Sequence, residues 1–364
     1  MEEIKLMKGN EALAEAAIRC GTDAYFGYPI TPQSEIIEYL MLNDPYERTG
    51  MVVLQAESEV AAINMVYGAS ACGKKALTTS SSPGISLKQE GISYIAGAEL
   101  PSVIANIVRG GPGLGTIQPS QADYFQAVKG GGHGDYNLIV LAPSSVQEMA
   151  DFVELSFDLA FKYRNPVMIL SDGIIGQMME KVTLKPQQKR LTDEEVAEKY
   201  GSWATLGRKK KNKSERNFIT SLDLKAELME DHNMKLQKKY REVEKNEVRY
   251  ETVNCEDADY ILVAFGSVAR ICKKAAEISR AKGIKVGVLR PITLWPFPKK
   301  EIAAYAEKIK GFLTVEMNVG QMVEDVRLAV NGKKPVEFYG RTGGVVPSPE
   351  EISLAVEQKL MGGK

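Results

Sequence analysis

The stretch Asp23-Ala-Tyr-Phe-Gly-Tyr-Pro-Ile-Thr-Pro-Gln-Ser34 decides the fold class of this chain. Residues 24–26 form an apolar strand that Gly27 ends, while Pro29 and Pro32 fix their own φ angles near about −65° and favour extended backbone at the residue before each. An acidic first turn and helical apolar spacing follow from Ser34. A strand that leads through a rigid turn into a helix is typical of open α/β sheets, which bind ligands at the carboxyl ends of their strands. Thr31 is therefore a candidate site residue, although its hydroxyl could equally cap a rigid turn.

The pattern of alternating strands and helices continues along the chain. Between residues 9 and 172, short apolar runs alternate with helical patterns at the spacing of βαβ units, which predicts a doubly wound, mostly parallel sheet with helices on both faces. The alternation stops where apolar residues become few and resumes at Tyr260 as a shorter βαβαβ series. We expect an α/β domain at 1–180, a charged connector at 181–250 and a smaller α/β domain at 251–364.

Composition limits the classes of function. The chain has 364 residues, of which 44% are hydrophobic and 26% charged, as expected for a globular protein with two cores. Its formal net charge of −1 gives no overall attraction to nucleic acid or anionic membranes, and the basic run Arg208–Lys213 is interpreted as a solvated loop. No apolar run approaches the roughly 18 residues of a membrane span, and the amino terminus lacks a signal-peptide pattern. We expect a cytoplasmic protein that binds neither nucleic acid nor membrane.

The metal-ligating residue types are scattered. None of the four cysteines belongs to a Cys-x-x-Cys pair, and the two histidines stand alone, namely Cys20, Cys72, Cys255, Cys272, His133 and His232. Zinc and iron–sulfur sites need such residues at close, regular spacing. The sequence therefore predicts no metal site of either kind in this chain.

Two further charged residues are candidates for a site. Glu59 lies in the expected first turn of an Ala-rich helix, where the helix dipole alone would favour a carboxylate. Arg109 follows the strand predicted at 102–108, and its guanidinium fork matches a substrate carboxylate, although a structural ion pair is an equally good interpretation. The glycines at Gly110–Gly115 lack the spacing of a dinucleotide fingerprint, so we do not expect a nicotinamide site.

Long motifs spread over nearly the whole chain resemble one enzyme family. They include Tyr28-Pro-Ile-Thr-Pro32, Glu59 followed nine residues later by Gly68, Ser80-Ser-Ser-Pro-Gly-Ile-Ser-Leu-Lys-Gln-Glu90, Arg109-Gly-Gly-Pro-Gly113, Gly132-His-Gly-Asp-Tyr136, Leu289-Arg-Pro-Ile-Thr-Leu-Trp-Pro-Phe297 and Phe338-Tyr-Gly-Arg341. Together they resemble the α chain of the 2-oxoacid:ferredoxin oxidoreductases. Gln33-Ser34-Glu35 and Gly113-Leu-Gly115 make the chain most similar to the branched-chain type, which acts on 2-oxoisovalerate (3-methyl-2-oxobutanoate).

The resemblance implies a fold and a set of site residues. The fold is a thiamine-diphosphate pyrimidine-binding-type domain followed by a transketolase C-terminal-like domain. Glu59, with Glu57 as the reserve candidate, would contact the aminopyrimidine of thiamine diphosphate, and Thr31 and Arg109 would hold the 2-oxoacid. The resemblance also puts three further residues at the cofactor, Tyr28, Pro29 and Ser81.

The resemblance also implies a divided enzyme. A β subunit would hold the diphosphate, Mg²⁺ and a 4Fe-4S cluster, and γ and ferredoxin-like δ subunits would complete the complex. The nearest match to the diphosphate motif, Ser171-Asp-Gly173, lacks the first glycine and the downstream Asn, so we interpret it as a turn at a strand end. The implied reaction is oxidative decarboxylation of a 2-oxoacid with coenzyme A to acyl-CoA, CO₂ and reduced ferredoxin, a step of anaerobic metabolism.

Several alternatives stay open at this point. The substrate could be 2-oxoglutarate or pyruvate, and the chain could be a noncatalytic scaffold or a decarboxylase or transketolase that works alone, although the missing diphosphate motif disfavours the last. His133 is expected to be a loop histidine bonded to backbone rather than a proton shuttle. Trp295-Pro-Phe-Pro298 is interpreted as a packing corner of the second domain or a subunit contact, and Met317–Asp325 as an interface.

Overall fold

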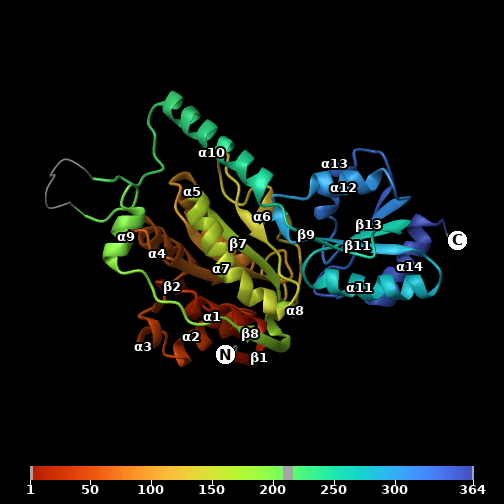
Figure 1. The fold of residues 1–364 in the computed structure, drawn as a ribbon, viewed down its shortest axis with the longest axis horizontal. Coiled ribbons are helices and arrows are strands. Elements are labelled where there is room, and N and C mark those ends of the chain that lie inside the picture. The colour runs from red at the N-terminus through yellow and green to blue at the C-terminus, as the bar shows by residue number, and fades with distance from the viewer. Residues whose placement is uncertain (1–2, 208–215, 363–364) are drawn as a thin grey trace.

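The computed structural model describes residues 3–207 and 216–362. The basic run Arg208–Lys213 therefore lies outside the described residues. Two separate sheets form the two halves of the chain, and a two-stranded ribbon lies beside the first of them (Figure 1).

The first sheet has seven strands in the order β12-β6-β7-β5-β4-β2-β3. Every neighbouring pair is parallel except β12 and β6, which are antiparallel. The central strands are apolar and wholly buried, as expected when both faces of a parallel sheet are covered. In chain order the strands are β2 (Ala24–Gly27), β3 (Val52–Gln55), β4 (Ala76–Ser80), β5 (Ser102–Val108), β6 (Ile139–Leu141), β7 (Pro166–Asp172) and β12 (Thr293–Trp295).

Helices cover both faces of this sheet, because alternate residues of its strands point to opposite sides. Ile104 of β5 belongs to the core that includes Ile63 of α4 (Glu59–Ala71) and Ile85 of α5 (Pro83–Gly97). Its neighbour Val103 belongs to the core under α1 (Gly9–Arg19) and α7 (Val146–Tyr163). The predicted doubly wound fold is confirmed. Four shorter helices complete this half, α2 (Ser34–Leu42), α3 (Pro45–Thr49), α6 (Tyr124–Val128) and α8 (Gly173–Gln177).

The second sheet has five strands in the order β14-β13-β10-β11-β9, all parallel except β9. The predicted βαβαβ series is confirmed. Its elements are β9 (Tyr250–Val253), β10 (Tyr260–Val263), α11 (Gly266–Ala281), β11 (Val286–Pro291), α12 (Lys299–Ala306), β13 (Gly311–Glu316), α13 (Met322–Val330), β14 (Val336–Gly340) and α14 (Pro349–Leu360).

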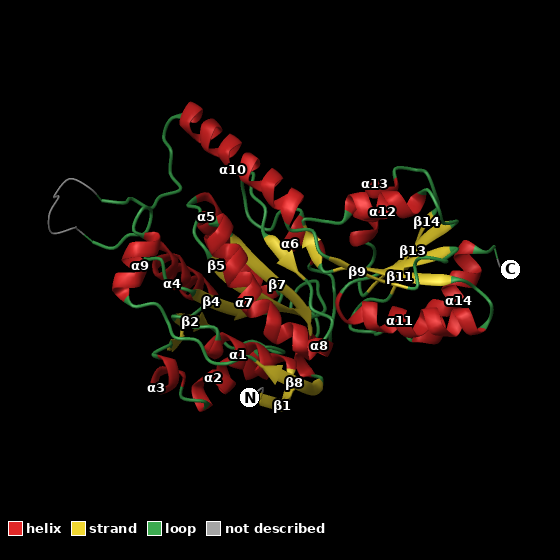
Figure 2. Cartoon of the chain, in the orientation of Figure 1, coloured by secondary structure: helices red, strands yellow, loops and turns green. Residues whose placement is uncertain are grey.

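The segment between the two halves contains regular structure, and the sequence pattern indicated only the longer of its two helices. Strand β8 (Met179–Leu184) pairs antiparallel with β1 (Glu3–Lys8), and neither strand was predicted. Two helices follow, α9 (Asp193–Tyr200) and the long, projecting α10 (Ala226–Asn246) (Figures 1 and 2). The domain boundaries near residues 180 and 250 stay a prediction.

Strand β12 corrects the interpretation of Trp295-Pro-Phe-Pro298. Thr293 and Trp295 pair with Leu141 and Val140 of β6, so this segment extends the first sheet although it follows strands of the second. The Trp295 ring also meets Tyr240 of α10 edge-on at 5.6 Å. The segment 293–298 therefore connects the two halves of the chain.

Polar contacts also hold the two halves together. The Gln121 backbone N–H donates to the carbonyl of Met317 at 3.0 Å, and the Met317 N–H donates to Gln121 Oε1 at 3.1 Å. The Tyr124 hydroxyl donates to Asp325 Oδ2 at 2.7 Å. The predicted interface at Met317–Asp325 is thus a contact between the two halves of this chain.

Candidate active site at the carboxyl edge of the first sheet

Buried polar side chains hold the turn that contains Thr31. Gln33 is buried; its Nε2 donates to the carbonyl of Tyr28 at 3.0 Å, and its Oε1 accepts from Thr79 Oγ1 at 2.5 Å. The Tyr25 hydroxyl pairs in turn with Thr79 at 2.7 Å. These contacts make the turn rigid, while the Thr31 side chain is exposed at its tip.

Arg109 contacts this turn from the next-but-one strand. Its side chain is buried, with 7% of its surface exposed; NH1 donates to the carbonyl of Thr31 at 3.0 Å and NH2 to the carbonyl of Leu114 at 3.1 Å. Among the described residues Arg109 Nε has no partner. The glycine loop closes tightly here, since a Cβ on Gly115 would lie 1.9 Å from the carbonyl oxygen of Gly110. Arg109 therefore fixes both the turn and the loop and still has unused N–H groups.

Glu59 is the first residue of α4. The N-cap Ser58 accepts from the N–H of Ala61 at 3.2 Å, so the helix begins at the carboxyl edge of the sheet. The Glu59 side chain is 6% exposed, and its carboxylate accepts no hydrogen bond from residues 3–207 or 216–362. A Cβ on Gly84 would lie 2.6 Å from Glu59 Oε1 and 2.1 Å from Ser80 Oγ, so α5 needs glycine there. Glu57, in contrast, is exposed and precedes the helix.

The structure brings Thr31, Glu59 and Arg109 to one edge of the sheet. The Ser82 hydroxyl contacts both the N–H and the carbonyl of Arg109 at 3.1 Å, and Gly84, two residues further on, abuts Glu59. An unbroken set of contacts thus runs from the Thr31 turn to the Glu59 carboxylate. Their roles in binding and catalysis stay predictions.

The three predicted cofactor residues differ in accessibility. Tyr28 is 37% exposed and Pro29 is half-buried, so both present surface beside the Thr31 turn. Ser81 is fully buried, and its hydroxyl has no hydrogen-bond partner in the described part of the chain.

Lys88 is a site residue that the sequence reasoning missed. It lies on α5 one turn after Gly84 and is fully buried. Its Nζ donates to Thr78 Oγ1 at 2.5 Å and to the carbonyl of Thr79 at 3.3 Å. Burial lowers the pKa of Lys88 to about 7, and the charge of Glu59 partly offsets that effect. The sequence contained a signal for this residue, because Lys88 falls among the apolar positions of α5, where a lysine is unusual.

Asp123 is a second missed residue near the site. It accepts a hydrogen bond from Asn106 Nδ2 at 2.8 Å, and Asn106 Oδ1 accepts from the N–H of Ser82 at 3.1 Å. Burial raises the pKa of Asp123, which the hydrogen bonds from Asn106 and Ser82 counteract. These contacts hold the segment between β4 and α5 against β5.

Two other predicted features have structural roles. Asp172 caps α8: its Oδ1 accepts from the N–H groups of Ile174 and Ile175, and its Oδ2 accepts from Ser267 Oγ at 2.6 Å. The interpretation of Ser171-Asp-Gly173 as a strand-end turn is confirmed. The expected bond from the His133 side chain to backbone is not seen in the described residues. Its ring meets Tyr94 edge-on, and its backbone carbonyl accepts from Ser93 Oγ at 2.6 Å.

Over the described ranges, no cluster of three or more His, Cys, Asp or Glu side chains could hold a metal ion. Within the same ranges, none of the helices is both long and apolar enough to cross a membrane.

Family models match both halves of the chain. Residues 15–251 match the thiamine-diphosphate-binding domain of pyruvate flavodoxin/ferredoxin oxidoreductase, and residues 258–352 match core domain II of pyruvate:ferredoxin oxidoreductase. The chain therefore belongs to the 2-oxoacid:ferredoxin oxidoreductase family, as its motifs predicted.

Comparison with individual proteins identifies the branched-chain type. The ketoisovalerate oxidoreductase subunit VorB of Methanothermobacter marburgensis is 51% identical over 93% of both chains. The 2-oxoglutarate synthase subunit KorA of Methanothermobacter thermautotrophicus is 36% identical over 97% of this chain and 98% of its own. This chain is a subunit of an oxidoreductase of the branched-chain type.

Solved structures share the fold. The 2-oxoglutarate:ferredoxin oxidoreductase from Magnetococcus marinus, solved with 2-oxoglutarate, coenzyme A and succinyl-CoA bound, superposes with a TM-score of 0.82 at 26% identity. It covers 99% of this chain, which spans 66% of the solved chain. A split-gene transketolase has a TM-score of 0.61 at 14% identity, a likeness of fold alone.

Proposed function

We propose that this chain is the α subunit of a complex that oxidatively decarboxylates 2-oxoisovalerate with coenzyme A, giving acyl-CoA, CO₂ and reduced ferredoxin. The observation that carries the proposal is the set of contacts from the Thr31 turn through Arg109 and Ser82 to the Glu59 carboxylate. A chain that only assembled partner subunits would have no need to hold an exposed hydroxyl, a guanidinium and a buried carboxylate together.

Thiamine diphosphate fits the residues present at this edge. When bound, it supplies the carbon nucleophile and the electron sink that a 2-oxoacid needs to lose CO₂. Glu59 would hold its aminopyrimidine, because the carboxylate is buried next to Gly84 and accepts no hydrogen bond from the described residues. Tyr28 and Pro29, which present surface, would line the same end of the cofactor, with the fully buried Ser81 behind them. This chain's contribution to proton transfer is a carboxyl oxygen of Glu59, which gives and takes back one proton.

The substrate would be held by the Thr31 turn and Arg109. Two N–H groups of the guanidinium already bond backbone carbonyls, and the remaining N–H groups of its two terminal nitrogens can donate to a carboxylate. The exposed Thr31 hydroxyl can donate to the keto oxygen. The neighbouring loop presents Leu114 and Ile117, which are 85% and 57% exposed, and this supports a substrate with a branched apolar side chain.

The remaining parts of the enzyme belong to other chains in this proposal. A β subunit carries the diphosphate site, Mg²⁺ and a 4Fe-4S cluster, and γ and ferredoxin-like δ subunits complete the electron path to ferredoxin. In support, both carboxylate oxygens of Asp172, in the nearest match to a diphosphate motif, are already bonded within this chain. The cytoplasmic location stays a prediction.

The test is a substrate panel on the native complex. The complex is purified anaerobically, and coenzyme-A-dependent viologen reduction is measured with 2-oxoisovalerate, 2-oxoglutarate, pyruvate and an arylpyruvate. The highest kcat/KM should be with 2-oxoisovalerate. Preference for another acid would keep the mechanism and reject the substrate, and no activity with any acid would favour the scaffold alternative.

A further inference from the structure

We propose that Lys88 is a positioning residue for Glu59, a buried cation that stabilises the Glu59 carboxylate whenever that group has given up its proton. The inference rests on the proposed role of Glu59 and extends it to a residue that would not itself touch cofactor or substrate. It follows from the packing of α5 against β4 and α4.

Lys88 and Glu59 are both buried beside the first turns of α5. Gly84 and Lys88 are four residues apart on α5, so they lie on the same helix face, and a helical side chain slants back toward the helix N-terminus. The Lys88 side chain therefore extends toward Gly84, the residue that abuts the Glu59 carboxylate. Lys88 is bound to the hydroxyl of Thr78, while Ser80 Oγ lies beside Gly84. These two residues of β4 project to the same face, about 7 Å apart along the strand.

The ammonium group is incompletely compensated within the chain. Its two hydrogen bonds go to the Thr78 hydroxyl and the Thr79 carbonyl, both neutral. No ion pair within 4.0 Å joins Lys88 to a carboxylate of the described residues, although the side chain is fully buried. Burying a charge without a partner is costly, so an apolar side chain would serve packing alone better than lysine.

The charged groups around Lys88 single out Glu59. Glu59 on α4 is the one charge that acts on the Lys88 pKa among the residues described, and it raises that pKa against the effect of burial. On β5, the neighbouring polar residue Asn106 is bonded to the buried carboxyl of Asp123. Glu90, on α5 itself, is exposed and bonds the Tyr94 hydroxyl. Thr78 and Ser80 on β4 carry no charge.

Ser80 lies beside Gly84, the residue that abuts the Glu59 carboxylate. Its hydroxyl is buried and makes no hydrogen bond within residues 3–207 and 216–362. Because a hydroxyl can rotate and both donate and accept, Ser80 Oγ is free to turn toward the Glu59 carboxylate when that group is charged. The positive charge of Lys88 lowers the free energy of the ionised form of Glu59 without contacting the reacting atoms.

The first test uses the native complex after removal of thiamine diphosphate, with the denaturation midpoint measured from pH 6 to 10. Because the pKa of Lys88 is about 7 in the folded chain and near its ordinary value of about 10.4 when unfolded, the unfolded state binds more protons between these values. Stability should therefore rise with pH across that window, and Lys88→Met should remove this part of the rise. Lys310→Met, an exposed lysine paired with Asp259, is the matched control and should leave the rise unchanged.

Coupling to Glu59 is measured in the same unloaded complex by a double-mutant cycle. Glu59→Gln should move the onset of the rise to lower pH, because Lys88 then loses the charge that favours its protonated form. In the Lys88→Met background, Glu59→Gln should leave the onset unchanged. An onset unaffected by Glu59→Gln would overturn the coupling, whatever the activity of the loaded enzyme.

The second test is the pH profile of turnover in the loaded complex. Lys88→Met should move the pH profile of kcat to higher pH by about 1–2 units, because the complex loses a buried positive charge near Glu59. An unshifted pH profile in a folded, active Lys88→Met complex would leave Lys88 with a structural role only.

If Lys88→Met does not assemble, Thr78→Val replaces it, because this variant keeps the lysine but removes its hydrogen-bond acceptor. The rise of stability with pH should then begin at lower pH, and an unchanged rise would reject the proposal. If the wild-type complex is inactive with every 2-oxoacid, the proposed function is rejected. The double-mutant measurement of coupling between Lys88 and Glu59 stays valid in that case.

Discussion

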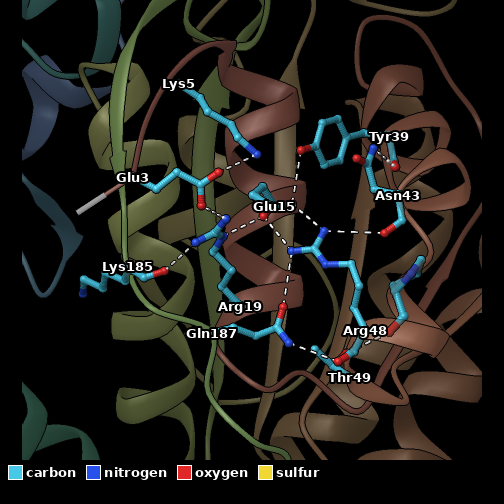
Figure 3. Close-up of polar contacts among 11 residues, drawn as sticks. Glu3, Lys5, Glu15, Arg19, Tyr39, Asn43, Arg48, Thr49, Lys185 and Gln187 are labelled. Carbon is cyan, nitrogen blue, oxygen red and sulfur yellow. Dashed lines mark hydrogen bonds and ion pairs between the residues drawn. The ribbon is translucent and has the colours of Figure 1, made fainter. Parts of the chain in front are cut away.

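Two buried glutamates of the first half of the chain differ in their hydrogen bonding. Glu15 of α1 is 1% exposed and accepts hydrogen bonds from Arg19 at 2.6 Å, from Arg48 at 2.7 and 3.0 Å and from the Tyr39 hydroxyl at 3.1 Å (Figure 3). Glu59 of α4 is 6% exposed and has no hydrogen-bond partner among the described residues. Lys88, a buried cation of the neighbouring helix α5, is bonded to neutral oxygens instead.

The difference separates a structural charge from a reactive one. Burial alone would raise the pKa of Glu15, but the hydrogen bonds from Arg48 and Arg19 outweigh it and lower the pKa, so this group stays ionised and fixed. A carboxylate bound by four donors cannot also exchange a proton with a ligand. The lone pairs of the Glu59 carboxylate stay available to a ligand. The rest of the fold offsets the free-energy cost of burying this group without a hydrogen-bond partner.

The largest effect is expected from Glu15→Ala. This change leaves Arg19 and Arg48 without their shared buried carboxylate, and breaking a buried ion pair in this way costs about 3 kcal/mol or more. Chemical denaturation of the complex should show that loss, while kcat per folded enzyme stays near the wild-type value. A large fall in kcat without a loss of stability would reverse the contrast between the two glutamates.

Glu59→Gln should give the opposite result. Because the amide cannot exchange the proton, we expect turnover to fall at least about a hundredfold while assembly and denaturation midpoint near neutral pH change little. Steady-state rates and size-exclusion elution of the complex measure both quantities. Glu57→Gln is the matched control, since Glu57 is exposed and precedes the helix; normal turnover in Glu59→Gln would remove that residue from the mechanism.

A smaller effect is expected from Arg109→Ala, which tests whether this buried cation serves substrate or structure. Loss of a charge-assisted contact to the oxoacid carboxylate should raise KM about tenfold or more, with a smaller change in kcat. The Thr31 and Leu114 carbonyls also lose their donor, so Arg109→Lys is included to keep the charge. Unchanged KM in both variants would make Arg109 a structural residue like Arg48.

The smallest effect is expected at the edge of the Glu15 network. Lys5 and Glu3 form an ion pair at 2.8 Å with side chains 45% and 43% exposed, and solvent screens such exposed pairs so that they contribute little to stability. Lys5→Ala should therefore leave the denaturation midpoint almost unchanged. A loss comparable to that of Glu15→Ala would mean that the network acts as one unit, from its exposed edge to its buried centre.

Much of the fold could be predicted from sequence, because both faces of a parallel sheet impose continuous apolar runs and the turns between strands and helices contain Gly and Pro. The strands that escaped prediction are those whose partners are distant in sequence. Strand β1 has the burial pattern of a mostly exposed ribbon and becomes a strand only because β8 pairs with it. Strand β12 is three residues long, and its partner β6 precedes it by about 150 residues of chain.

For the candidate site, the sequence by itself determined the residue types and their places at strand ends. Thr31, Glu59 and Arg109 each follow a strand or open a helix, and the carboxyl ends of parallel strands meet at one edge, so local pattern was enough to propose them. Their motifs also determined the family, since long runs of unusual residues carry that information without coordinates.

Tertiary structure alone decided which groups are buried and which are paired. Glu15 and Glu59 are both helical glutamates in sequence, and only packing surrounds one with two guanidinium groups and leaves the other without a donor. Lys88 is buried and bonded to Thr78 only because α5 packs against β4. Burial and pairing depend on residues distant in the chain, so they exist only once the elements have packed, and they decide which carboxylate is structural and which can react.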